Sequence, residues 1–177
     1  ATFQKIDGEE NNLSIEVAPN ASLAVIDGIG GAETTLTTKG EVRLSGESDY
    51  RGETTIQKGG ILYSENNFAL SEVSPVVIEA GGELDLQGFD NTISSLSGSG
   101  DIVLNPRTSL MESSDDLVEG ADLEIQGGNF AGSIHDGGFS GLGSVIKDGD
   151  GTLFLSGFNK YSAPTEIRDG VLSIVNA

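Results

Sequence analysis

Short runs of alternating apolar residues are the feature that most limits how this chain can fold. Apolar residues recur two positions apart in at least nine stretches, which is the period of a β-strand because successive side chains leave opposite faces. Clusters of Gly, Asn, Asp and Ser separate the stretches and supply the positive φ angles of tight corners. No convincing amphipathic helix is found, so an all-β fold is predicted. The stretches are Leu13/Ile15/Val17, Leu23/Val25, Val42/Leu44, Val76/Ile78, Leu84/Leu86, Ile102/Leu104, Leu123/Ile125, Leu153/Leu155 and Leu172/Ile174.

The length and net charge of the chain limit both its fold and the kinds of partner it can bind. A chain of 177 residues with 36% hydrophobic residues is long enough for one domain with a continuous core. The net charge is −19, yet the apolar residues lie in patterned strands, so disorder is not expected. Cations are few and scattered, which argues against nucleic acid and against an anionic membrane surface.

The residue types that are absent exclude several kinds of site. The chain has no cysteine and one histidine, His135, which excludes disulfides, thiolate metal sites and histidine-rich metal centres. No apolar stretch approaches the ~18 residues that span a bilayer, and residues 1–5 lack the features of a signal peptide. We therefore expect no cofactor and no direct membrane insertion, with any targeting segment outside this sequence.

Internal repetition decides among the all-β architectures. Short, evenly spaced strands are compatible with a sandwich, a barrel or a solenoid. The segment Gly40–Gly46, followed by Tyr50, matches the segment Gly151–Gly157, followed by Tyr161, at a constant offset of 111 residues. Both copies end in a glycine corner and a new strand, which favours a solenoid.

A second, related phrase lies between the two copies. Residues 76–104 read as strand, corner, strand, corner and strand. Such units cannot bury an apolar face alone, but they share one interior column when they are stacked. At roughly 20 residues a rung we expect eight or nine rungs and a rod about 40 Å long.

The residues from 142 to 174 resemble the passenger-associated transport repeat of autotransporters, the type V secretion proteins. Residues 127–134 resemble the phrase that usually precedes this repeat, and residues 81–104 are similar to another stretch common in these passengers. The resemblance implies a right-handed parallel β-helix that reaches the cell surface through a C-terminal outer-membrane barrel, with the repeat region promoting folding and export. The matching residues are Lys147, Gly149, Gly151, Thr152, Leu153, Leu155, Ser156, Gly157, Asn159, Tyr161, Thr165, Ile167, Gly170 and Leu172.

The organisation that we expect is one β-helix over residues 1–177. It contains a first transport-like repeat at 37–64, the related phrase at 76–104, a loop or extrusion at 105–122, and a transport-repeat unit at 123–177. The residues that define the two repeats are Gly40, Leu44, Ser45, Gly46, Tyr50, Ile56, Gly151, Leu153, Leu155, Ser156, Gly157, Tyr161, Ile167, Gly170 and Leu172.

Catalysis is not expected within this segment. A Ser-His-Asp triad around His135 and Asp136 is formally available, but no nucleophile elbow surrounds it, and residues 133–137 read as a strand that ends in a glycine turn. The acid pairs Asp115/Asp116 and Glu9/Glu10 could be nominated for glycoside hydrolysis. Adjacent acids on a strand point to opposite faces, so a solvated acidic surface is the better interpretation.

Two weaker binding hypotheses remain. Asp148 and Asp150 lie in an Asp-Gly-Asp-Gly run that resembles half of a calcium loop, but the downstream bidentate Glu is missing. Tyr50, Tyr161, Phe154 and Phe158 could stack on sugars, yet their fixed place in the repeat favours core or corner packing.

Two functions follow from the resemblance. The first is a structural rod that supports adhesion, by binding a host surface or matrix ligand or another copy of itself, at the cell surface or as a secreted protein. The second is the stalk of a larger secreted protease or other enzyme whose catalytic domain lies outside residues 1–177. Self-association would need complementary polar ladders, because two uniformly negative faces repel.

Overall fold

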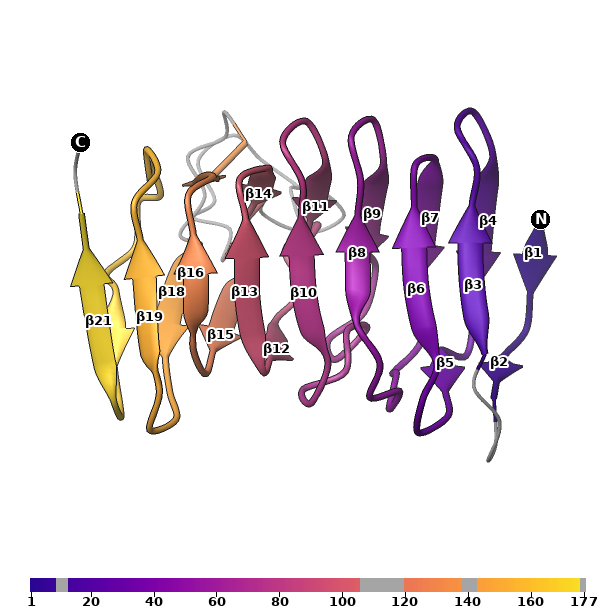
Figure 1. The fold of residues 1–177 in the computed structure, drawn as a ribbon, viewed down its shortest axis with the longest axis horizontal. Helices are drawn as coiled ribbons and strands as arrows, with labels where there is room; N and C mark the ends of the chain where they lie inside the picture. The colour runs from indigo at the N-terminus through magenta and orange to yellow at the C-terminus, as the bar shows by residue number, and fades with distance from the viewer. Residues whose placement is uncertain (9–12, 106–119, 138–142, 176–177) are drawn as a thin grey trace, which may run out of the picture.

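The chain winds as a parallel β-solenoid in which each turn stacks on the turn before it (Figure 1). The computed structural model describes residues 1–8, 13–105, 120–137 and 143–175. Every strand pairing among these residues is parallel and joins segments that are distant in sequence. The described residues contain no helix, so the all-β prediction is confirmed and no helix of the described part could cross a membrane.

The largest sheet has eight strands and forms the side that faces the viewer in Figure 1. We call it the eight-stranded sheet. Its strands, in stacking order from the N-terminal end, are β3 (Ser14–Val17), β6 (Thr35–Thr38), β8 (Thr54–Ile56), β10 (Pro75–Ile78), β13 (Ser95–Gly98), β16 (Gly128–Phe130), β19 (Thr152–Leu155) and β21 (Val171–Ile174).

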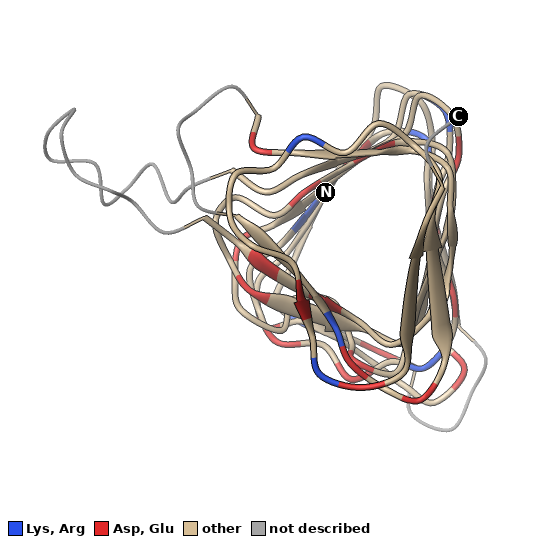
Figure 2. Cartoon of the chain, turned by 90° about the vertical axis from the view of Figure 1, so that its left-hand side faces the viewer, with Lys and Arg blue, Asp and Glu red and all other residues tan. Residues whose placement is uncertain are grey.

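The other sides of the solenoid are formed by three smaller sheets. The seven-stranded sheet contains β1 (Thr2–Phe3), β4 (Ser22–Val25), β7 (Glu41–Leu44), β9 (Ile61–Ser64), β11 (Glu83–Asp85), β14 (Asp101–Val103) and β17 (Ser133–His135). The four-stranded sheet contains β12 (Asn91–Ile93), β15 (Asp122–Ile125), β18 (Ser144–Lys147) and β20 (Glu166–Ile167). The two-stranded sheet contains β2 (Ile6–Asp7) and β5 (Ile29–Gly30). Viewed along the rod, the sheets enclose a roughly triangular cross-section (Figure 2).

The core is a set of columns that run along the rod. Alternate residues of each strand point inward and stack on equivalent residues of the next turn, as in Val42 on Leu62, which lies on Leu84. These three side chains are fully buried. One continuous apolar cluster runs from Val17 to Leu155. The sequence alternation therefore marked the inward positions correctly.

The solenoid makes about seven turns, and the expected count of eight to nine rungs is not confirmed. Stacked partners lie between 18 residues apart, as for Leu36 and Thr54, and 32 residues apart, as for Leu96 and Gly128. The 32-residue step contains residues 106–119, which lie outside the described residues. These residues make up most of the loop or extrusion predicted at 105–122. A count based on a uniform 20-residue rung is too high because this turn is much longer.

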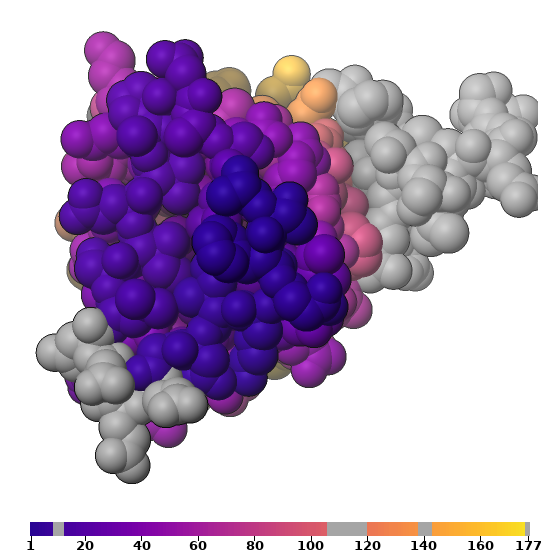
Figure 3. Space-filling view, turned by 90° about the vertical axis from the view of Figure 1, so that its right-hand side faces the viewer, coloured from indigo at the N-terminus to yellow at the C-terminus, as the bar shows by residue number. Residues whose placement is uncertain are grey.

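Residues of the first turn form the N-terminal end of the rod (Figure 3). A hollow of about 640 Å³ lies there, lined by apolar side chains of the first turn that include Phe3, Ile6, Ile15 and Leu23. Phe3 is exposed and Ile15 is half-buried, whereas their partners in the next turn, Val25 and Leu36, are buried. The core columns are therefore incompletely covered at this end.

Candidate functional site

Each copy of the repeat forms one complete turn of the solenoid. In the first copy β7 is followed by β8 and then by β9, which stacks directly on β7. In the second copy β19 is followed by β20 and then by β21, which stacks directly on β19. The motif strand lies in the seven-stranded sheet in the first copy and in the eight-stranded sheet in the second. The 111-residue offset does not reveal this change of side.

A tyrosine occupies the same position in both copies, in the corner that follows the motif strand. The hydroxyl of Tyr50 lies 2.5 Å from Thr54 Oγ1, and the hydroxyl of Tyr161 lies 2.6 Å from Thr165 Oγ1. Tyr50 is fully buried, and this burial raises the pKa of its phenol. The tyrosine fills the corner with apolar area while its hydroxyl is satisfied four residues later.

The glycine that follows the motif strand allows two turns to approach closely. A Cβ on Gly46 would lie 2.3 Å from the backbone carbon of Asp27, and a Cβ on Gly157 would lie 1.7 Å from the backbone oxygen of Gly132. No side chain fits at such distances. Glycine at this position is therefore required by stacking on the preceding turn.

The other repeat-defining residues fall into three groups. Gly40, Leu44, Ile56, Leu153 and Leu155 are buried; Ser45, Ser156, Gly151 and Leu172 are half-buried; Ile167 and Gly170 are exposed. Ser45 donates a hydrogen bond from its hydroxyl to Glu65 at 2.8 Å. Ile167 is 55% exposed although its counterpart Ile56 is buried, because β20 has a stacked neighbour on only one side in the described chain.

Two aromatic residues of the repeat are not in the core. Phe154 is 44% exposed and Phe158 is 79% exposed, so the packing prediction holds for Tyr50 and fails for these two. Phe154 lies between the inward residues Leu153 and Leu155, and strand alternation directs it outward.

Lys147 has a role that sequence analysis missed. It occupies an inward position of β18, in register with Ile125 and Ile167, and is fully buried. Its ammonium group donates hydrogen bonds to the carbonyl oxygens of Gly149 at 2.6 Å and Asp169 at 3.1 Å. One buried charge therefore joins the corners of two successive turns. The second partner lies 22 residues away, which no local motif indicates.

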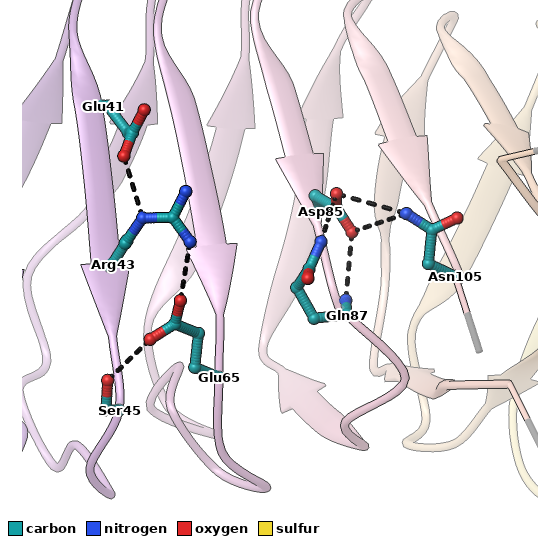
Figure 4. A network of polar contacts seen from close by, with 7 residues as sticks. All are labelled: Glu41, Arg43, Ser45, Glu65, Asp85, Gln87 and Asn105. Carbon is teal, nitrogen blue, oxygen red and sulfur yellow. Dashed lines mark hydrogen bonds and ion pairs between the residues drawn. The ribbon is translucent and has the colours of Figure 1, made fainter. Parts of the chain in front are cut away.

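The outer face of the seven-stranded sheet carries a polar network (Figure 4). Arg43 donates to Glu41 at 2.8 Å and to Glu65 at 2.7 Å, and its guanidinium lies 4.1 Å from the ring centre of Tyr63. The hydrogen bond to Glu65 raises the pKa of Arg43. Two turns further on, Asp85 accepts hydrogen bonds from Gln87 and Asn105. These contacts form two clusters, one that joins the turns of β7 and β9 and one that joins the turns of β11 and β14.

Carboxylates crowd this same face. Burial raises the pKa of Glu83, and the neighbouring charges of Asp85 and Asp101 raise it further, while His135 opposes them. The face is therefore acidic and under charge repulsion.

A lateral groove of about 440 Å³ lies beside Phe68. Phe68 has a φ of 62°, which is an unfavourable backbone conformation for a bulky residue. Its side chain is 51% exposed, so burial of the ring does not offset this cost. Four carboxylates, those of Asp27, Glu47, Asp49 and Glu72, line the groove together with the two cations Lys5 and Arg51. The groove combines an exposed aromatic ring with excess negative charge.

The remaining candidates do not converge. Asp148 uses its carboxylate to accept a hydrogen bond from the Gly149 amide, and Asp150 is exposed. His135 Nδ1 accepts from the Gly137 amide, and Gly137 has a φ of 70°, as expected for a glycine turn. Within the described ranges no three His, Cys, Asp or Glu residues form a group able to hold a metal. Glu9, Glu10, Asp115 and Asp116 lie outside these ranges.

Comparison with known proteins gives two matches. The family model of the passenger-associated transport repeat matches residues 39–62 and 145–174. The chain is 32% identical over 156 residues, 80% of its length, to the adhesin BmaC autotransporter of Brucella suis biovar 1 (strain 1330). It spans 4% of the length of that adhesin. No solved structure matches the chain. An adhesin relative and a structural repeat agree with the prediction that this segment is not an enzyme.

Proposed function

Because this chain is a segment of an autotransporter passenger that carries passenger-associated transport repeats, we propose that it is a structural rod that supports adhesion at the bacterial surface. The observation that carries the proposal is the continuous stack of about seven turns, in which each transport repeat forms one turn. A solenoid presents long lateral surfaces rather than a deep cleft. Such surfaces suit contact with an extended ligand.

The lateral groove beside Phe68 is the adhesive surface that we assign to a host surface or matrix ligand. Its aromatic ring provides apolar contact area, and Glu47, Asp49 and Glu72 attract cationic groups. The strained backbone of Phe68 supports a binding role, because strain at an exposed position is retained where it serves a function.

We propose further that the solenoid is right-handed and that its C-terminal turns assist export. Parallel strands of one sheet are joined by right-handed crossovers in nearly all proteins. Each turn offers a row of free backbone groups on which the next turn can form, so the turns nearest the C-terminal barrel can template those that follow. Deletion of residues 123–177 should reduce surface display, and unimpaired display would contradict this role.

Surface display tests the proposed function directly. Residues 1–177 are fused to a heterologous outer-membrane barrel on a non-aggregating bacterium, and settling and attachment to epithelial cells are scored. We expect attachment to rise, and Phe68→Ser to lower it more than the control Phe158→Ser, which replaces an exposed phenylalanine outside the groove. Correct display with neither settling nor attachment would favour a stalk whose activity lies elsewhere in the parent protein.

A further inference from the structure

The outer face of the eight-stranded sheet is nearly free of charge. From β6 to β21 its outward-facing strand residues are hydroxyl, amide or apolar side chains. They are Thr35, Thr37, Thr55, Pro75, Val77, Ser95, Ser97, Asn129, Thr152, Phe154, Val171 and Ser173. We call this surface the neutral face. Glu16 in β3 and Glu53, which accepts a hydrogen bond from Thr55, lie beside it.

Charge is concentrated elsewhere on the rod. In the view along its axis the strands of the eight-stranded sheet that lie nearest the viewer are tan, while acidic residues lie on the other sides and at the corners (Figure 2). The outward positions of the seven-stranded sheet include Glu41, Glu83 and Asp101, in one column. For a chain with a net charge of −19, this separation leaves one side where like-charge repulsion is weak.

We propose that the neutral face is the surface on which a second copy of this rod associates. The inference rests on the proposed function and names the surface for its self-association. Serine and threonine hydroxyls both donate and accept hydrogen bonds, so a ladder of them is complementary to itself. A face of carboxylates only accepts and cannot pair with its own copy. Self-complementarity is what a two-fold contact between identical surfaces requires.

The size of the face sets the strength of the contact. The seven strands from β6 to β21, at about 4.8 Å spacing and each about 13 Å long, give about 440 Å² per copy. The total of about 900 Å² is below the roughly 1,200 Å² at which stable interfaces begin. Association between single rods is therefore weak and reversible, and many rods on two apposed cells strengthen it by multivalency.

Salt dependence distinguishes this contact from one made of ion pairs. The approach of two acidic rods is opposed by the charges on their other sides, and added salt screens that repulsion. Association through the neutral face becomes tighter as salt rises, whereas an interface of salt bridges becomes weaker. Sedimentation equilibrium of residues 1–177, up to about 1 mM chain, measures the dissociation constant at low and high salt.

Two matched double variants locate the surface. Ser97→Glu with Ser173→Glu places two carboxylates on the neutral face, and Ala24→Glu with Ser133→Glu places two on the seven-stranded sheet. We expect the first pair to weaken association at least tenfold and the second to leave it within twofold. Circular dichroism checks that both pairs fold. Equal effects of both pairs, or a chain that stays monomeric at every concentration, would overturn the proposal.

Crosslinking provides a test that does not depend on added charge. The chain has no cysteine, so Ser97→Cys introduces one thiol near the middle of the neutral face, and Ser133→Cys introduces one on the seven-stranded sheet. A short bis-maleimide should link two copies through position 97 and not through position 133. Equal crosslinking at both positions would show that the contact is not specific to the neutral face.

The two proposals can fail separately. If displayed rods attach to epithelial cells but do not associate in solution, the neutral face is not the self-association surface and the adhesive function stands. If rods associate through position 97 but displayed cells neither settle nor attach, the inference holds and the adhesive function fails.

Discussion

At the scale of single residues, wholly or partly buried polar groups stabilise the corners of the turns. Tyr50 and Tyr161 bond a threonine four positions later, and Lys147 bonds carbonyl oxygens of two successive corners. A buried polar group is costly unless its partner is present. These residues therefore fix which corner geometry the chain adopts.

Removal of the Tyr50 hydroxyl should destabilise the first repeat. Tyr50→Phe keeps the ring but leaves Thr54 without this partner at a fully buried site. We expect a loss of about 1–2 kcal/mol in the free energy of unfolding, measured by urea denaturation. Tyr63→Phe is the control, because Tyr63 is half-buried on the outer face. Equal losses in both variants would refute a corner role for the hydroxyl.

Lys147 should matter more than an exposed lysine. Lys147→Met keeps the apolar stem and leaves two carbonyl oxygens without the ammonium group. The expected loss is about 1–3 kcal/mol, against little change for the exposed Lys58→Met. A neutral or stabilising Lys147→Met would show that the apolar column around Ile125 and Ile167 compensates fully.

The carboxylate of Glu83 predicts a pH dependence. Its pKa is raised in the folded chain by burial and by Asp85 and Asp101, so the folded state binds this proton more tightly than the unfolded state. The stability that protonation provides is present at low pH and is lost as pH rises through the folded pKa. Glu83→Gln should therefore raise stability at pH 7 and reduce the difference between pH 7 and pH 5. Glu47→Gln, in the lateral groove, serves as control; identical pH profiles for both variants would contradict the argument.

At the scale of strands and turns, glycine permits neighbouring turns to approach closely at their corners. Gly157 lies against Gly132, whereas Gly127 has no atom closer than 3.4 Å to the position of a Cβ. Only the first of these two glycines is required by the approach of the preceding turn.

A matched pair of alanine substitutions tests this distinction. Gly157→Ala should cost about 1–3 kcal/mol, because the backbone of the neighbouring turn must move to accept the methyl group. Gly127→Ala should cost much less in the same denaturation experiment. A similar cost at both positions would mean that chain entropy rather than stacking explains these glycines.

The strands and their inward residues could be predicted from the sequence, whereas the register in which one turn stacks on another could not. Alternation in Val42–Leu44 or Leu84–Leu86 marks inward residues because a strand has a fixed two-residue period. The sheet to which a strand belongs depends on the length of every preceding turn. Leu96 and Gly128 are stacked partners although 32 residues separate them, so a constant sequence offset does not predict which sheet a later strand joins. The exposure of Phe154 follows from the same alternation, but its fixed position in the repeat led to the incorrect prediction that it packs in the core or at a corner. The hydrogen bond from Lys147 to Asp169 and the composition of the neutral face both depend on the register between turns. This register could not be predicted from the sequence.

At the scale of the whole molecule, the chain is a rod whose outward residues form straight columns. One column on the neutral face runs through Thr37, Thr55, Val77, Ser97, Asn129, Phe154 and Ser173. Distance along it depends on the number of turns and not on the number of residues between two positions. The proposed adhesive surface and the proposed self-association surface both depend on this arrangement.

Spin-label distances along that column test the stacked-rung solenoid most directly. Thr37 and Asn129 are four steps apart and Thr37 and Ser173 are six, so at about 4.8 Å a step the backbone separations are about 19 Å and 29 Å. Pairs of cysteines at these positions, labelled and measured by double electron–electron resonance in dilute solution, should give distances in the ratio of four to six. Distances that do not increase with the number of turns, as in a sandwich or a barrel, would contradict the account.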